Sequence, residues 1–157
     1  MKLINTENIT RALKEIEKAF KENDKAVVVA KEDNFNRKIL ENYKVYAIIG
    51  VEYGFKKDRL KQRNSGLNHV FCRLAEKNNI KICIDFSCLY KFDDFEKSII
   101  LSRIMQNIRL CRKYKANIIL ANTEKLGSKF DLFPFLISLG MDTRTAKYAI
   151  DNQITIS

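Results

Sequence analysis

Three carboxylates follow apolar segments of strand length, an arrangement that would place acid–base chemistry at one end of a parallel sheet. Glu52 follows the apolar segment 45–51, Asp85 lies near the end of segment 81–86, and Glu124 follows segment 117–121. In a barrel-like fold the carboxyl ends of the strands carry the catalytic groups, so the three side chains could converge as a hydrolytic site. The alternative is that they cap helices or pair with the abundant lysines. We favour this second interpretation.

Other residues that could do chemistry do not form a recognisable site. The chain has one histidine, His69, and four cysteines separated by 11, 5 and 23 positions, which is unlike the usual zinc-binding spacings. A nucleophilic pair of Cys72 and His69 lacks an evident third group to orient it. The five glycines are scattered, so no phosphate-binding glycine-rich loop is present. We therefore predict no catalytic residue, no bound metal and no cofactor in the chain itself.

The positive charge of the chain is concentrated in its middle. The net charge of +10 divides into +1 for residues 1–55, +10 for residues 56–129 and −1 for residues 130–157. Concentrated positive charge attracts a polyanion, which favours nucleic acid as a partner. The densest run is opposed only by Asp58 and has no apolar periodicity, which indicates an exposed basic loop. We call this run the basic loop; its basic residues are Lys56, Lys57, Arg59, Lys61 and Arg63.

A second basic cluster falls on a separate element. Residues 94–115 predict a long helix in which Leu101, Ile104, Ile108 and Cys111 form one apolar stripe. Polar and basic residues follow at other helical positions. A polar helix face often serves solubility alone, but the two clusters together favour RNA binding. The second candidate set is Arg103, Arg109, Arg112 and Lys113.

The elements that would position these residues alternate between strands and helices. Thr6 is expected to cap an amphipathic helix over residues 7–22, and apolar strands are predicted at 26–30, 45–51, 81–86 and 117–121. Further helices are predicted at 37–42, at 67–77 with Ser65 as the cap, around Pro134 within 132–139, and at 143–150. A final edge strand is expected at 154–156.

This alternation predicts the α/β class, with a parallel sheet covered by helices, in one domain spanning residues 1–157. Eight β/α units would leave about 20 residues each, fewer than a complete barrel needs. We therefore expect five or six strands.

The cysteine pattern indicates a reducing compartment, and the hydropathy indicates a soluble protein. No CxxC pair occurs, so reduced, buried thiols are expected rather than a disulfide framework. The longest stretch without charge, residues 132–141, is too short to span a bilayer. The start of the chain does not have the pattern of a signal peptide. We expect a soluble, cytoplasmic protein.

Three segments resemble the ribonuclease P protein component 3 family, the archaeal and eukaryotic thirty-kilodalton subunit. Residues 63–70, with Leu74 and Ala75 after them, contain the Gly66-Leu67-Asn68-His69 step that opens a helix in the family. Residues 101–115 are similar to the long basic helix of the family, and residues 131–141 to its late segment containing proline. The order and spacing also agree, over roughly residues 45–150.

The resemblance implies a TIM-barrel-like fold without catalytic residues of its own, in a protein subunit of ribonuclease P. It implies that the RNA subunit cleaves precursor tRNA at the 5′ end through bound magnesium. It also implies a small ferredoxin-like partner subunit, often in a heterotetramer. Both basic sets would contact RNA, and Ser65, Gly66, Asn68 and His69 would form a structural motif at a helix start.

The chain differs from the family in length, because members usually run past 200 residues. The first β/α units are expected to be lacking, with only the amphipathic helix before Ala26. We therefore expect an incomplete barrel that is open at one edge or closed by a second copy or a partner. Two other functions remain open: a general RNA-binding or interaction domain derived from the family, and a vestigial hydrolase using Glu52, Asp85 and Glu124.

Overall fold

The fold is built on a five-stranded parallel sheet. The computed structural model describes residues 1–53, 58, 64–121 and 128–156, without the side chains of Cys88 and Lys129. The strands are β1 (Lys2–Ile4), β2 (Ala26–Val29), β3 (Val45–Ile49), β4 (Lys81–Asp85) and β5 (Ile118–Ala121). They lie in the order β1-β2-β3-β4-β5, and each pairs in parallel with the next.

Sequential strand order with one direction of winding is the arrangement of a barrel, whereas a doubly wound sheet reverses its order. The predicted α/β, TIM-barrel-like class is confirmed, with five strands in the described part of the chain.

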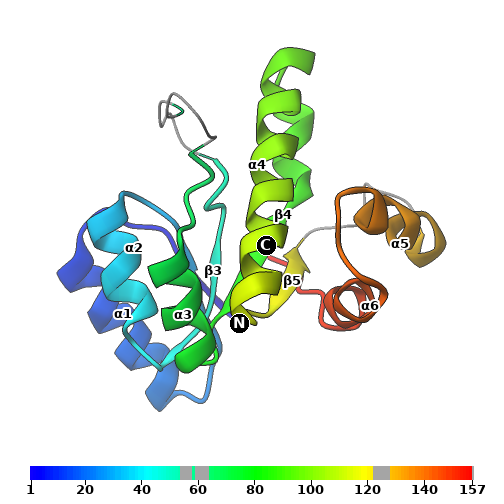
Figure 1. Cartoon of the computed structure of the whole chain (residues 1–157). Helices are drawn as coiled ribbons and strands as arrows, with labels where there is room; N and C mark the ends of the chain where they lie inside the picture. The colour runs from blue at the N-terminus through cyan, green and yellow to red at the C-terminus, as the bar shows by residue number, and fades with distance from the viewer. Residues whose placement is uncertain (54–57, 59–63, 122–127, 157) are drawn as a thin grey trace.

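Helices connect these strands and lie in two groups in Figure 1, with α1, α2 and α3 together and α5 with α6 beyond β5. The long helix α4 runs between them. The bounds are α1 (Ile9–Lys21), α2 (Asp33–Leu40), α3 (His69–Lys77), the 3-10 helix η1 (Phe86–Lys91), α4 (Asp94–Tyr114), α5 (Lys129–Ser138) and α6 (Thr143–Asp151). None of the described helices combines the length and the apolar character that crossing a membrane requires.

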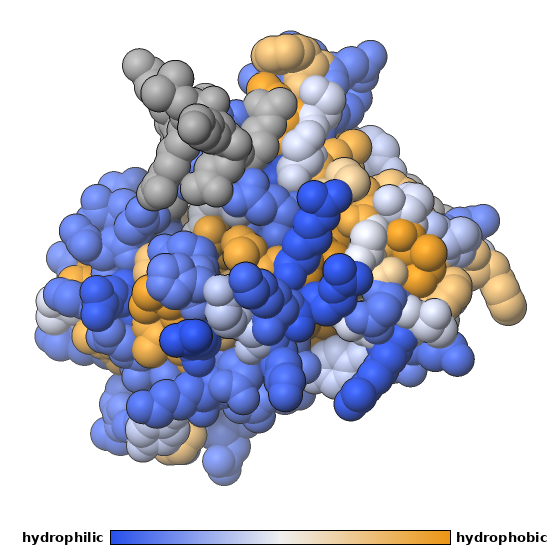
Figure 2. All heavy atoms as spheres, in the orientation of Figure 1, coloured by the Kyte–Doolittle hydropathy of each residue, from blue (hydrophilic) through white to orange (hydrophobic). Residues whose placement is uncertain are grey.

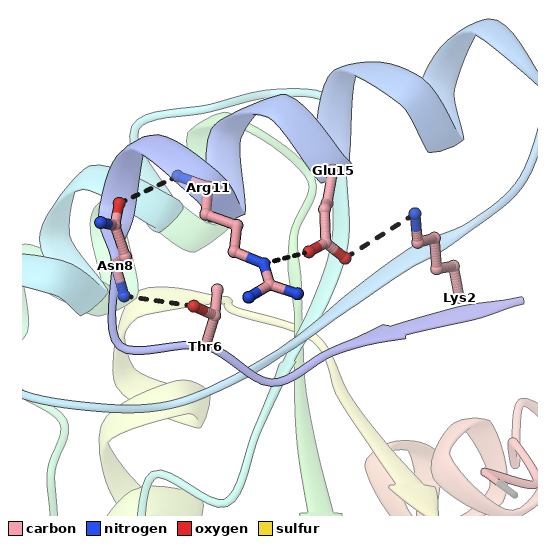
Figure 3. A network of polar contacts seen from close by, with 5 residues as sticks. All are labelled: Lys2, Thr6, Asn8, Arg11 and Glu15. Atoms are coloured by element: carbon pink, nitrogen blue, oxygen red, sulfur yellow. Dashed lines mark hydrogen bonds and ion pairs between the residues drawn. The ribbon is translucent and has the colours of Figure 1, made fainter.

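A β/α unit precedes Ala26, contrary to the expectation that only a helix does. Residues Lys2–Ile4 form β1, and Leu3 pairs with Val27 of β2. Figure 3 shows how this strand is joined to α1: Glu15 lies between Arg11 at 3.1 Å and Lys2 of β1 at 3.7 Å. A three-residue strand that contains a lysine is too short to show a periodic pattern. The sequence interpretation therefore missed it.

Two helix caps lie a few residues after the predicted ones. Asn8, not Thr6, caps α1 by accepting a hydrogen bond from the Arg11 N–H at 3.1 Å (Figure 3). Thr6 instead accepts from the Asn8 N–H at 3.3 Å. Likewise Asn68, not Ser65, caps α3 and accepts from the Phe71 N–H at 2.9 Å. Ser, Thr and Asn are all good caps, so residue type alone does not decide which one begins the helix.

The sheet is buried on both faces, which explains why its strands are apolar throughout. One face packs against the helices in the main core, a cluster that includes Ile48 and Ile82 of the sheet and Ile104 and Ile108 of α4. The other face holds a smaller cluster of buried apolar residues, against which Tyr148 of α6 packs. Its buried residues are Val27, Ala47, Ile49, Cys83, Ile119, Ala121 and Ile154. Of the predicted final strand, only Ile154 pairs, in a single parallel bridge to Ala121.

Candidate nucleic-acid interface

The basic loop follows β3 in the sequence, after the described residues 50–53. Its five basic residues, Lys56, Lys57, Arg59, Lys61 and Arg63, lie outside the described residues, and the prediction that they contact RNA stays a prediction. Asp58 and the flanking segments 51–53 and 64–66 are described. The contacts of these flanking segments fix where the loop is attached.

Arg103 of α4 holds both the start of the loop and Asp58. One guanidinium nitrogen donates to the backbone oxygen of Glu52 at 3.3 Å, and the other lies 3.5 Å from Asp58 Oδ1. The same Asp58 oxygen accepts from the Asn64 N–H at 2.9 Å. Only 8% of Arg103 is exposed. Its guanidinium binds the protein rather than solvent, so we remove Arg103 from the predicted set of RNA contacts.

The end of the loop packs closely against its start. Asn107 of α4 donates from its side chain to the backbone oxygen of Ser65 at 3.0 Å. Gly66 has a φ of +81°, and a Cβ added there would lie 1.9 Å from the backbone oxygen of Val51. Only glycine fits this contact, because it has no Cβ and adopts positive φ freely. These contacts support the structural role that the sequence predicts for Ser65, Gly66 and Asn68.

His69, the last residue of this motif, is exposed, as is Asn68. It is the first residue of α3, and its ring centroid lies 6.4 Å from that of Tyr114 at the end of α4. Arg73 and Lys113 approach the same tyrosine ring, each at 5.5 Å from the centroid. A cationic and aromatic group thus surrounds Tyr114. The predicted set omitted Arg73 and Tyr114, because the contact joins two helices that are distant in sequence.

The remaining predicted residues of α4 are exposed. Arg109, Arg112 and Lys113 point away from the core, and none of them forms an ion pair within the described part of the chain. They lie three and four positions apart on the carboxyl-terminal half of the helix, where such residues share one face. Figure 2 shows hydrophilic side chains over the lower part of the molecule, where α3 and the end of α4 lie in Figure 1.

Asp85, one of the three candidate catalytic carboxylates, forms hydrogen bonds within the protein. Asp85 caps η1, accepting from the Ser87 N–H at 2.9 Å and the Ser87 hydroxyl at 2.7 Å. Tyr53 donates its hydroxyl to the backbone oxygen of Asp85, and its ring stacks on Phe92. Glu124 lies outside the described residues. Within the described residues, no three His, Cys, Asp or Glu side chains gather as a metal site.

Glu52 is the most unusual polar residue of this region. Its side chain is 1% exposed, and neither carboxylate oxygen has a hydrogen-bond partner among the described residues. Burial raises the pKa of Glu52 to about 8, and the negative charge of Asp85 adds to the rise. The backbone N–H groups of Glu52 and Asp85 lower the pKa of Glu52 and so offset part of this rise, although neither has hydrogen-bond geometry. Glu52 is thus protonated at neutral pH.

The cysteine prediction is confirmed for three of the four residues. Cys72, Cys83 and Cys111 are free and buried. The side chain of Cys88 lies outside the described set.

Comparison with known proteins agrees with the resemblance seen in the sequence. No protein-family model matches the chain. Ribonuclease P protein component 3 of Methanococcus maripaludis strain C5 is 26% identical over 119 residues, which is 76% of this chain and 48% of the relative. The chain is similar to ribonuclease P protein component 3. The protein of that name from Methanocaldococcus jannaschii is 27% identical over 84 residues, 51% of this chain and 36% of the relative.

A solved structure has the same fold as this chain. A chain in the cryo-EM structure of archaeal ribonuclease P with mature tRNA matches with a TM-score of 0.78 and 23% identity. The match covers 95% of this chain and 63% of that chain. The chain spans about half the length of the curated ribonuclease P protein component 3 relatives it matches.

Proposed function

We propose that the chain is a protein subunit of ribonuclease P, a tRNA-processing endoribonuclease. In this role it binds the catalytic RNA and supports removal of the 5′ leader from precursor tRNA. Two observations support the proposal together. The fold agrees over nearly the whole chain with a subunit solved in archaeal ribonuclease P. Exposed basic residues on α4, without carboxylate partners in the described part of the chain, provide the charge that RNA phosphates require.

The chemistry in this proposal belongs to the RNA. Asp85 caps η1, and Glu52 is enclosed and protonated, which supports a structural role for both. We do not adopt the vestigial-hydrolase alternative, because Asp85 is engaged as a cap and the third residue, Glu124, lies outside the described residues. We propose that magnesium binds to the RNA of the holoenzyme, that a small ferredoxin-like subunit pairs with this chain, most simply as a heterotetramer, and that the complex works in the cytoplasm. A homodimer is the alternative assembly.

A second candidate function is a general RNA-binding domain derived from the same family. The observation that favours it is that the exposed basic residues of α4 provide charge for RNA in general and do not by themselves select the RNA of ribonuclease P. Both functions require RNA binding, and they differ in whether the chain increases cleavage by the holoenzyme.

The α4 face is tested by removing two charges that contact no carboxylate in the described structure. We expect Arg109→Ala with Lys113→Ala to reduce the magnitude of the slope of log K against log salt by about 1.4–1.8, because each phosphate contact contributes roughly 0.7–0.9. The measurement is fluorescence anisotropy with ribonuclease P RNA between about 50 and 200 mM salt.

The matched control for this double variant is Lys14→Ala with Lys21→Ala, which removes two exposed charges from α1. Its slope is expected to stay within experimental error of the unmodified protein. Equal slopes in both double variants would show that the α4 face is not part of the RNA interface.

A further inference from the structure

A cavity lies at the amino-terminal end of the sheet, opposite the attachment of the basic loop. It has a volume of about 540 Å³ and is enclosed by the end of α4, the start of β5 and α6. Figure 1 shows these three segments at the same end of the molecule. Three of its lining residues are basic, namely Arg112, Lys115 and Arg144, and one is aromatic, Tyr148.

The net charge of this cavity is positive. Hydrogen bonds from Thr145 and, to a smaller extent, the charge of Arg112 lower the pKa of its acid, Asp142. The only acid lining it is Asp142, which caps α6 by accepting from the N–H and the hydroxyl of Thr145 at 2.8 and 3.0 Å. The side chains of Arg112, Lys115 and Arg144 are exposed and form no ion pair within the residues that the structure describes. An anionic group would therefore meet three cations in a concave site.

A pair of lysines extends the positive surface across the sheet. Lys25 precedes β2 and Lys81 begins β4, and their ammonium groups lie 4.6 and 4.8 Å from the ring centroid of Tyr46 on the intervening β3. Neither lysine pairs with a carboxylate in the described part of the molecule. Burial and the charge of Lys25 both lower the pKa of Lys81. An anion bound near both ammonium groups would reduce the repulsion between them.

The cavity and the lysine pair are linked by two tyrosines. Tyr148 of the cavity and Tyr46 beneath the lysine pair pack against the same group of buried residues on one face of the sheet. Burial and, to a smaller extent, Tyr46 raise the pKa of Tyr148. This side of the sheet thus carries the cations of the cavity, two tyrosines and the lysine pair. Alternating cationic and aromatic groups are typical of proteins that bind single-stranded RNA, because backbone phosphates and unstacked bases are then recognised together.

We propose that this cavity binds one unpaired nucleotide of an RNA, with the phosphate among Arg112, Lys115 and Arg144 and the base against Tyr148. The lysine pair binds a neighbouring phosphate. The volume is within the usual range for small-ligand sites and is suited to a single nucleotide. A base within a duplex is not available to such a cavity. This proposal rests on the proposed RNA-binding function and adds a second contact at the other end of the sheet from the basic loop.

The test compares a short single-stranded oligoribonucleotide with an RNA duplex of the same length. We expect the unmodified protein to prefer the single strand, and Arg144→Gln with Lys115→Gln to weaken single-strand binding at least fivefold. Tyr148→Leu should weaken it about fivefold or more, because one base–aromatic stack is lost, whereas Tyr148→Phe should restore the affinity. Rescue by phenylalanine separates stacking from a packing defect.

Lys147→Gln is the control and is compared with the single variant Arg144→Gln, because each removes one positive charge. Lys147 is exposed on α6 beside Tyr148 and does not line the cavity. Affinity unchanged in the Arg144/Lys115 double variant, or lowered equally by Lys147→Gln, would overturn the proposal. Binding of an acidic peptide is tested with polyglutamate. If the Arg144/Lys115 double variant loses polyglutamate binding as much as it loses RNA binding, the proposal is overturned in favour of an acidic protein partner. If RNA binding is lost only in the Arg109/Lys113 variant, the cavity proposal fails while the proposed function stands. If the unmodified protein binds no RNA, the proposed function fails.

Discussion

Alanine at Gly66 is expected to lower the free energy of unfolding by about 3 kcal/mol, because two costs add at this residue. The φ of +81° is unfavourable for any residue with a Cβ, by roughly 1–2 kcal/mol. The new Cβ would also lie 1.9 Å from the backbone oxygen of Val51, and relieving such a clash typically costs about 1–3 kcal/mol. Urea unfolding measures the sum. RNA binding through the basic loop should weaken as well, because the two ends of the loop meet at this contact.

Gly140 provides the matched control. Its φ is +99°, but nothing lies within 4 Å of an added Cβ, so Gly140→Ala should show only the backbone cost, about 1–2 kcal/mol. A Gly66→Ala variant no less stable than Gly140→Ala would mean that the segments before and after the basic loop do not pack as described.

The second large effect is on the pH dependence of stability, through Glu52. The pKa of Glu52 is about 8 in the folded protein and near its ordinary value of 4.5 in the unfolded chain. Below pH 4.5 both states hold the proton, and the stability associated with the neutral carboxyl is complete. Between pH 4.5 and 8 only the unfolded chain releases the proton, so stability falls by about 1.4 kcal/mol per pH unit as pH rises.

Glu52→Gln should remove this dependence, because glutamine keeps the shape of the protonated acid and does not titrate. We expect the free energy of unfolding of the variant, minus that of the unmodified protein, to increase from pH 5 to pH 8 by on the order of 3–5 kcal/mol. The measurement is chemical unfolding across that range. Acids with lowered pKa, such as Asp24 and Asp142, titrate alike in both proteins and cancel. Parallel curves would show that Glu52 is ionised in the folded state.

The sequence predicted the elements that have a long apolar pattern. Strands β2 to β5 and helix α4 appear where runs of Val, Ile and Ala or a helical stripe indicate them. Strand β1 was missed because three residues carry no periodicity. Its position depends on pairing with β2, which is information that no local pattern contains.

The site was predicted less completely than the fold. Arg109, Arg112 and Lys113 are exposed as expected, but Arg103 is buried although its residue type is the same. The difference is positional: Arg103 faces the ends of the basic loop, where Glu52 O and Asp58 accept its hydrogens. The cavity that Arg144 shares with Lys115 depends on how α6 packs beside α4. The amino-acid sequence alone does not reveal this cavity, because the two residues are 29 positions apart.

Reconstitution tests the central claim, that the chain is a ribonuclease P subunit, most directly. Precursor tRNA, an archaeal ribonuclease P RNA and its small partner subunit are incubated at low magnesium with and without this chain, and correct 5′ cleavage is measured. The account predicts that the chain increases correct cleavage and that the protein without the RNA cuts nothing. No increase from a folded chain that still binds the RNA would contradict the claim and favour a general RNA-binding domain.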